Sequence, residues 1–356
     1  MAAEHTGDTS ADLDISKKTP HKAPPEQPRP TRAVPCLLCG TETQPWQDVP
    51  KDWRRVGNPL AERIWNLRQC DACDFRFLHP RPASEDVADF YATDDYYTHQ
   101  NDGDWSAGDM PFQDKLRHHL AWRVDQGKYL EPGIVAASVP MLTAGESSRV
   151  LDLGCGNGGL LKGLATLGYD VTGVEPDDDA RAVASETGLT VYKGTAEDLP
   201  SELLSQRGTF DAVVMSHVLE HTLSPVEAVS AVVDLLAPGG LFICEVPNNA
   251  CYEAERAGPR WSFLDVPRHL NFFTAESLEA LMEKCRCPVQ SRQYVGYARQ
   301  FTPHRFDNER RIAEALEGKQ IGEPKTFEKW RRFAGTVLAS DDAKYDSIRV
   351  LARKPK

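Results

Sequence analysis

The alternation of apolar and polar positions near residue 150 predicts a strand, a glycine turn and a helix in close succession. An apolar run at 150–153 leads into Gly154, Gly156 and Gly158. Leucines then recur on one helical face, and a glycine follows them: Leu160, Leu161, Leu164, Leu167 and Gly168. Glycine can take positive φ and leave the helix N-terminus open toward a bound molecule. We therefore expect a small polar ligand at this turn.

A second predicted strand ends in a carboxylate suited to hold a ribose. Residues 170–175 form an apolar segment that ends at Glu175. In dinucleotide folds an acid about twenty residues after the first glycine binds ribose hydroxyls. The glycine spacing alone also fits a nicotinamide oxidoreductase, which we keep as an alternative. Asp152, however, would repel a pyrophosphate and attract an ammonium group, so the charges favour S-adenosylmethionine.

From about Arg149 to the C-terminus the chain resembles the class I S-adenosylmethionine-dependent methyltransferases. Five segments occur in the family's order: VLDLGCGNGG at 150–159, VTGVEPD at 171–177, GTAEDLP at 194–200, FDAVVMSHVLEH at 210–221 and APGG at 237–240. The resemblance implies an α/β fold with a Rossmann-like seven-stranded sheet, preceded here by a small zinc-binding domain.

The resemblance and the charge argument together place eight residues at the cofactor: Asp152, Gly154, Gly156, Glu175, Asp177, Ala196, Glu197 and His217. The two glycines would face the methionine part, and Glu175 would hold the ribose hydroxyls. Asp177, Ala196 and Glu197 would lie near the ribose edge and the adenine. A simpler interpretation makes Glu197 a solvated acid that caps the next turn.

Four of the nine cysteines form two pairs with the spacing of a metal site: Cys36, Cys39, Cys70 and Cys73. Each C-x-x-C loop presents two thiolates from one side, which suits tetrahedral zinc. Four thiolates close the coordination shell, so we expect a structural ion, with disulfides or an iron–sulfur site as alternatives. The remaining cysteines are interpreted as free buried thiols.

Length and composition suggest two folded modules and a polar leader. We expect a disordered leader at 1–34, a zinc-ribbon-like domain at 35–82, a helical bridge that covers the cofactor at 83–145, and a methyltransferase domain at 146–356. An insertion at about 300–344, with Trp330 and Phe333 on its inner face, is interpreted as a lid over the substrate.

Charge and hydropathy narrow the partners. A net charge of −12 argues against a nucleic-acid substrate, because binding to a phosphate backbone relies on Lys and Arg. Neither a stretch of eighteen apolar residues nor an apolar signal core occurs in the sequence. We therefore expect a cytoplasmic protein without a membrane span that acts on a small molecule; the oligomeric state stays open.

Two histidines are candidates for the catalytic base, His221 and His269. A neutral imidazole can accept the proton of the methylated group, and ligands of open α/β sheets bind at the carboxyl ends of the strands. The N-terminal cysteines and these positions resemble the nucleotide-sugar C-methyltransferases, in which the aligned histidines are active-site residues. That family has Tyr and Glu where this chain has Val266 and Arg268.

Other polar residues at the same rim are weaker candidates. Arg268 is a possible anion site, Asn248 and Asn249 are possible substrate contacts or turn formers, and Tyr96 and Tyr97 are possible contacts from the bridge. We expect methyl transfer to the oxygen or carbon of a small polar metabolite, such as a nucleotide sugar or natural-product intermediate, with a histidine base. The alternatives are a cofactor-binding docking module without catalysis and an RNA or protein methyltransferase.

Overall fold

The computed structural model describes residues 34–55, 63–91, 111–125, 130–139 and 147–356. Residues 1–33 of the expected leader and the tyrosines at 96 and 97 lie outside these residues, whereas Val34 begins the first described strand. Within the described residues no helix is both long and apolar enough to cross a bilayer.

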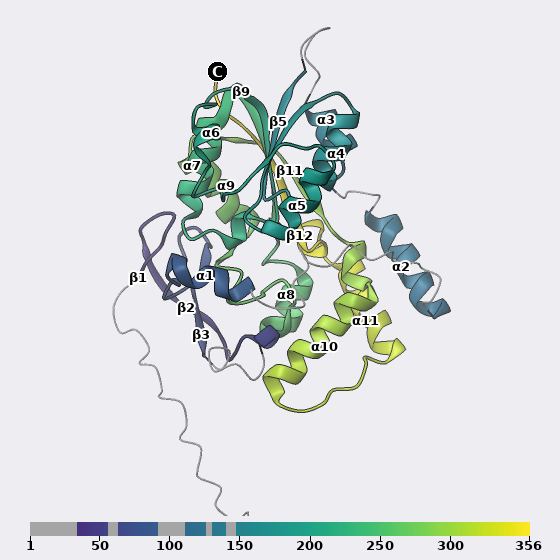
Figure 1. Cartoon of the computed structure of the whole chain (residues 1–356). Coiled ribbons are helices and arrows are strands. Elements are labelled where there is room, and N and C mark those ends of the chain that lie inside the picture. Colours follow the sequence, from purple (N-terminus) through teal and green to yellow (C-terminus); the bar gives the residue numbers. More distant parts are fainter. Residues whose placement is uncertain (1–33, 56–62, 92–110, 126–129, 140–146) are drawn as a thin grey trace, which may run out of the picture. The chain divides into compact units, whose positions relative to one another are not determined.

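A seven-stranded mixed sheet forms the centre of the larger domain (Figure 1). Its strands follow the order β11 (Val289–Val295), β12 (Ser347–Arg353), β9 (Leu236–Pro247), β8 (Phe210–Ser216), β5 (Arg149–Leu153), β6 (Asp170–Val174) and β7 (Val191–Tyr192). The five strands from β9 to β7 are parallel, whereas β12 runs antiparallel to both β9 and β11. The expected seven-stranded α/β sheet is confirmed.

Helices cover both faces of this sheet, because successive strand residues point to opposite sides. On one face Val213 and Met215 pack with α7 (Pro225–Leu235) and α9 (Ala275–Lys284). On the other face Ala212 and Val214 pack with α3 (Pro132–Ser138) and α4 (Gly159–Thr166). Two shorter connections are helical as well, α5 (Asp178–Glu186) and α6 (Ser201–Leu204).

The predicted strand, turn and helix at residue 150 are present. Leu161 and Leu164 of α4 are fully buried, while Leu167, just beyond the helix, is 48% exposed. Gly158 is the N-cap at φ +79°, and Gly168 follows the last turn at φ +93°, so glycine bounds the helix at both ends. The helix N-terminus therefore opens at the carboxyl end of β5.

A second, five-stranded sheet contains the cysteine pairs. Its strands are β1 (Val34–Pro35), β2 (Glu42–Val49), β3 (Trp65–Gln69), β4 (Arg76–Leu78) and β10 (Asn271–Phe272). Strand β10 comes from the C-terminal part of the chain and pairs antiparallel with β4. Trp65, Leu67 and Leu78 share a hydrophobic core with Trp261 and Phe272. The small sheet is thus completed by residues that follow β9 by more than twenty positions.

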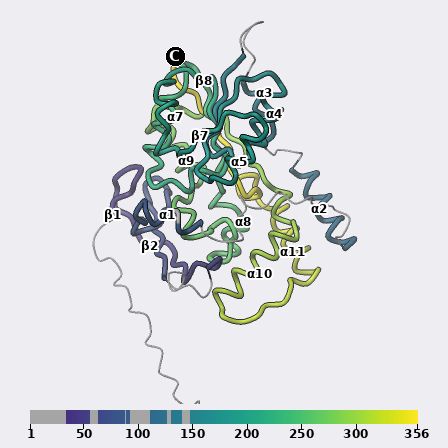
Figure 2. Tube along the Cα trace, in the orientation of Figure 1, coloured from purple at the N-terminus to yellow at the C-terminus, as the bar shows by residue number. Residues whose placement is uncertain are grey.

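A short helix, η1 (Trp53–Arg55), lies between β2 and β3. Further helices follow β4 or connect the later strands: α1 (Ser84–Tyr91), α2 (Phe112–Asp125), η4 (Leu219–His221), α8 (Tyr252–Ala257) and η5 (Gly258–Arg260). Between β11 and β12 lie η6 (Ala298–Phe301), α10 (Pro303–Glu317), α11 (Thr326–Leu338) and α12 (Asp341–Lys344), which Figure 2 traces in yellow-green. Phe333 of α11 packs on Tyr297 and Phe301, with ring centroids 6.1 and 5.3 Å apart.

Candidate functional site

The glycine turn after β5 combines one tightly packed position with one open position. At Gly154, φ is +77° and an added Cβ would lie 2.4 Å from a methyl group of Val218. At Gly156, φ is +53° and an added Cβ would meet no atom within 4 Å. The backbone at Gly156 thus faces open space, where a ligand can approach the main chain.

Two buried carboxylates lie beside this open turn. Glu175 accepts hydrogen bonds from the backbone amides of Gly156 (2.8 Å) and Asp177 (2.9 Å). Burial raises the pKa of Glu175 above its ordinary value despite these bonds. Burial and the charge of Glu175 raise the pKa of Asp152 to about 7. A cationic ligand would relieve the repulsion between the two groups, so the site fits an ammonium or sulfonium and disfavours a pyrophosphate.

The residues expected around the adenine have structural partners. Asp177 caps α5 by accepting from the amide of Ala180 at 2.7 Å, and Ala196 is buried. Glu197 accepts from the amides of Leu223 (2.9 Å) and Ser224 (2.5 Å) just before α7. Glu197 thus binds backbone amides 26 and 27 positions later and not those of the next turn, and its hydrogen bonds tie the loop after β7 to the loop after β8.

His217 lies between two glutamates at the end of β8. Its Nδ1 is 3.3 Å from Glu220 Oε1, and its Nε2 is 3.3 Å from Glu245 Oε1. Burial alone would lower the pKa of His217, but the two carboxylates outweigh it and raise the pKa to about 9. His217 is therefore a cation near neutral pH, which excludes it as a proton acceptor there.

His221 and His269 lie together, with ring centroids 4.6 Å apart in a T-shaped contact. His269 Nδ1 is 2.7 Å from the Phe263 carbonyl oxygen, and His221 Nδ1 is 3.1 Å from the Arg268 carbonyl oxygen. A carbonyl oxygen only accepts, so Nδ1 carries a hydrogen in both rings, and whenever a ring is neutral its Nε2 is the acceptor. Burial and the neighbouring His221 lower the pKa of His269 to about 4, so His269 is neutral at pH 7.

Three weaker candidates at this rim are structural. Arg268 is 1% exposed and donates to both Asp52 and Asp265, so it is not open to an anionic substrate. Asn248 donates its side-chain amide to the carbonyls of Asp342 (2.7 Å) and Tyr345 (3.0 Å). Asn249 donates to the carbonyls of Pro247 and Phe273. Asn248 also accepts from the amide of Ala250 at 3.1 Å, the contact expected of a turn former, while the other bonds of the two asparagines hold distant segments together.

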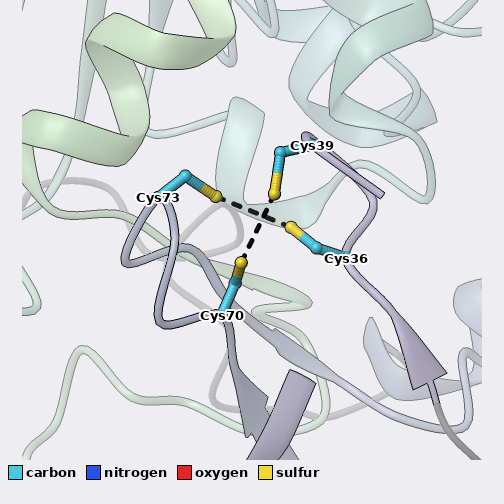
Figure 3. A group of neighbouring side chains, drawn as sticks. All are labelled: Cys36, Cys39, Cys70 and Cys73. Atoms are coloured by element: carbon cyan, nitrogen blue, oxygen red, sulfur yellow. Dashed lines mark hydrogen bonds between the residues drawn. The ribbon is translucent and has the colours of Figure 1, made fainter. Parts of the chain in front are cut away.

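The four paired cysteines converge on one point (Figure 3). Their thiols are free, with Sγ–Sγ distances of 3.6 Å between Cys36 and Cys73 and 3.4 Å between Cys39 and Cys70. A tetrahedral ion with Zn–S bonds of about 2.3 Å places its sulfur ligands about 3.8 Å apart. The amide of Leu38 also donates to Cys36 Sγ at 3.4 Å, which eases thiolate charge. The donor set fits a closed zinc site.

Two residues that lie beside the histidine pair were not singled out from the sequence. Glu220, directly before His221, is 1% exposed and lies near both histidines. Its place in the Glu-His pair after β8 was a usable signal. Tyr91, whose hydroxyl lies 2.9 Å from His221 Nδ1, is 130 positions away in sequence and gave no signal.

Comparison with known proteins shows what part of the larger domain is similar to. Residues 126–285 match the family described as a methyltransferase domain. The ubiquinone biosynthesis O-methyltransferase of Cereibacter sphaeroides is 34% identical over 148 residues, which cover 38% of this chain and 58% of the relative. The enzyme of the same name from Roseobacter denitrificans is 40% identical over 106 residues, which cover 28% of this chain and 41% of the relative. The chain therefore spans less than two thirds of these relatives.

Among solved structures, 1,6-didemethyltoxoflavin-N1-methyltransferase of Burkholderia thailandensis, with S-adenosylhomocysteine bound, aligns with 82% of this chain and 96% of its own. The identity is 16% and the TM-score is 0.43, so this likeness carries no argument about function.

Proposed function

We propose that this chain, which carries a class I S-adenosylmethionine-dependent methyltransferase domain, methylates a hydroxyl group of a small polar metabolite, with a histidine as the proton acceptor. The observation that carries the proposal is the pair of buried carboxylates, Asp152 and Glu175, beside the open backbone of Gly156. The names of the O-methyltransferase relatives support oxygen as the acceptor atom.

The cofactor would lie over Gly156, with its cationic methionine part toward Asp152 and its ribose toward Glu175. The carboxylate oxygens of Glu175 already accept two backbone hydrogen bonds, which fix the side chain for a ligand hydroxyl. Asp177, Ala196 and Glu197 would shape the adenine end, and Gly154 would hold the turn against Val218. When bound, S-adenosylmethionine supplies an electrophilic methyl group.

His269 would accept the proton of the acceptor hydroxyl on Nε2. A neutral ring and an Nδ1 hydrogen fixed on the Phe263 carbonyl leave Nε2 free to accept a hydrogen bond from the hydroxyl. Because the pKa of His269 is about 4, full proton transfer requires the negative charge that develops on the acceptor oxygen to raise that pKa. His221, held by the Arg268 carbonyl and close to Tyr91, would position the acceptor or share the proton. His217 would contribute its positive charge and not a base.

We also propose that Cys36, Cys39, Cys70 and Cys73 hold a structural zinc ion. The four thiolates leave no open coordination position, so the ion would stabilise the small sheet and take no part in the chemistry. The proposed division of the chain keeps the zinc-binding domain at 35–82, the bridge at 83–145 and the methyltransferase domain at 146–356. The insertion at 300–344 remains a proposed lid.

Calorimetric titration of the purified chain with S-adenosylmethionine and with NADH tests the cofactor. We expect micromolar binding of the former and none of the latter; the reverse preference would overturn the proposal. S-adenosylhomocysteine release is then measured with phenolic and nucleotide-sugar acceptors.

His269→Asn should keep cofactor affinity and lower turnover by about 10²- to 10⁴-fold. His119→Asn, at an exposed position on α2, is the matched control and should behave as wild type. Tight cofactor binding without turnover on either acceptor class would favour the docking-module alternative.

A further inference from the structure

We propose that Glu220, His221 and His269 bind a divalent transition-metal ion at a second metal site, separate from the four cysteines. The chemical role suggested below for the ion rests on the proposed function. Binding of the ion is argued from the geometry of the three side chains alone.

The three side chains converge from two segments of the chain. One ligand atom from each, a carboxylate oxygen and two imidazole nitrogens, lies within 4.8 Å of the others. Glu220 and His221 are adjacent in η4, while His269 precedes β10. The amide of Leu270 donates to the Glu220 carbonyl at 2.8 Å, which holds the two segments together. At these separations between the ligand atoms, an ion could bind all three after small side-chain movements.

Both histidines are oriented as metal ligands are. A ligating imidazole commonly donates its second ring hydrogen to a carbonyl or carboxylate, which fixes the ring and leaves the other nitrogen for the metal. Here the Nδ1 hydrogens are committed to the carbonyls of Phe263 and Arg268. Each Nε2 therefore carries a lone pair, and the two rings lie 4.6 Å apart by their centroids.

Glu220 supplies an independent observation that points to a cation. Its carboxylate is 1% exposed, and neither oxygen receives a hydrogen bond from any described residue. The nearest cation is His217, whose Nδ1 lies 3.3 Å from Oε1 without the geometry of a hydrogen bond. A second glutamate, Glu245, shares that cation. His217 offsets the charge of Glu220, but the acceptor positions of both oxygens stay unfilled, and a metal ion would fill one of them.

The ligand types select the kind of ion. Two imidazoles and one carboxylate favour Fe²⁺, Co²⁺, Ni²⁺ or Zn²⁺ over Mg²⁺ and Ca²⁺, which prefer oxygen ligands. Three protein ligands leave coordination positions open, unlike the four cysteines. An acceptor hydroxyl could occupy one of these positions, and its pKa would fall as it binds the ion.

With the ion in place, the histidines act as ligands and not as bases. The acceptor hydroxyl releases its proton to water, and the alkoxide or phenolate oxygen forms the new bond to the methyl carbon as the bond from carbon to sulfur breaks. Without the ion, the proton passes to His269 Nε2 as described above. Methyl transfer would then require the bound ion, and the oxidation state of the ion would not change.

The test counts metal ions bound to the full chain, with no cofactor or acceptor present. Protein stripped with a chelator is reloaded with Co²⁺, freed of excess metal by dialysis and measured by elemental analysis and visible absorption. We expect Glu220→Gln and His269→Asn each to hold one equivalent fewer than wild type, with the thiolate-to-cobalt absorption of the cysteine site unchanged. His119→Asn, the matched control, should retain the wild-type number.

Equal metal content in wild type, Glu220→Gln and His269→Asn would overturn the proposal. Glu220→Gln keeps the shape of the side chain, and its thermal midpoint shows whether a lost ion reflects misfolding. Since the count needs no turnover, a failure to methylate any acceptor would leave this result standing. Conversely, cofactor binding by protein that lacks the second ion would leave the proposed function standing.

Discussion

Replacing Arg268 with alanine would remove the cation at the centre of a buried network beside His269. The guanidinium donates to Asp52 at 3.0 and 2.7 Å and to Asp265 at 3.1 and 2.9 Å. It also donates to the Phe90 carbonyl at 3.2 Å. Asp52 comes from the loop before η1, so the network joins the N-terminal segment to the loop that carries the catalytic candidate.

The expected cost follows from burial. The Arg268 side chain is 0% exposed, and those of Asp52 and Asp265 are 2% and 7% exposed. Burial alone would raise the pKa of Asp265, but Arg268 and Arg54 hold it far below its ordinary value. Removing one partner of a buried ion pair leaves an uncompensated charge and costs about 3–5 kcal/mol. With an unfolding entropy of about 2.1 cal/mol/K per residue, we expect the thermal midpoint of a chain of this size to fall by roughly 4–7 °C.

Denaturant and thermal unfolding at pH 7 measure the effect, with Arg207→Ala as the matched control. Arg207 also pairs with an aspartate, Asp234, but at 3.9 Å and with side chains 61% and 60% exposed. Its loss should change the free energy of unfolding by about 1 kcal/mol or less. If Arg268→Ala and Arg207→Ala proved equally stable, the reasoning from burial would be refuted.

Three further predictions concern the cofactor turn and the charges near it. Because the pKa of Asp152 is about 7, cofactor affinity should rise with pH up to about 7 and then level off, and calorimetry of Asp152→Asn should lose this dependence. Gly156→Ala and Gly188→Ala both place a side chain at positive φ with open space around it, so each should cost about 1–2 kcal/mol in unfolding, yet only Gly156→Ala should weaken cofactor binding. The pKa of His217 rises from 6.5 to about 9, so its charge stabilises the fold below about pH 6.5, and up to about 3 kcal/mol of stability should be lost as pH rises through 9. Unfolding of His217→Gln over the same range should show a smaller decline, and parallel curves would contradict the assignment.

Local patterns predicted the central fold because each depends on a few neighbouring residues. The apolar run before Gly154 and the helical spacing of Leu161 and Leu164 fix a strand, a turn and a helix without reference to distant contacts. The N-cap of α9 is equally local, since the Thr274 side chain accepts from the amide of Ser277, three residues later. The two C-x-x-C loops likewise carry their own geometry.

The remainder depends on contacts between distant segments. Arg268 was an anion-site candidate because the sequence does not place Asp52, 216 positions earlier, beside it. Glu197 bonds the loop before α7, 26 positions later in the sequence, a contact that no periodicity encodes. Strand β10 has two residues, too few for an alternating pattern, and it forms because β4 offers an edge. The two carboxylates that keep His217 charged, Glu220 and Glu245, likewise come together only in the assembled fold.

The pairing of β10 with β4 bears on how such a chain can evolve and be engineered. The cysteine-bearing sheet is completed by Asn271 and Phe272, two positions after His269. Removing the residues before 84 would delete β4 and so leave the backbone of β10 without a partner. It would also expose Phe272, whose exposed fraction is now 0%. The N-terminal segment therefore cannot be exchanged freely between enzymes. Any replacement must supply a strand whose edge pairs with β10, directly after His269.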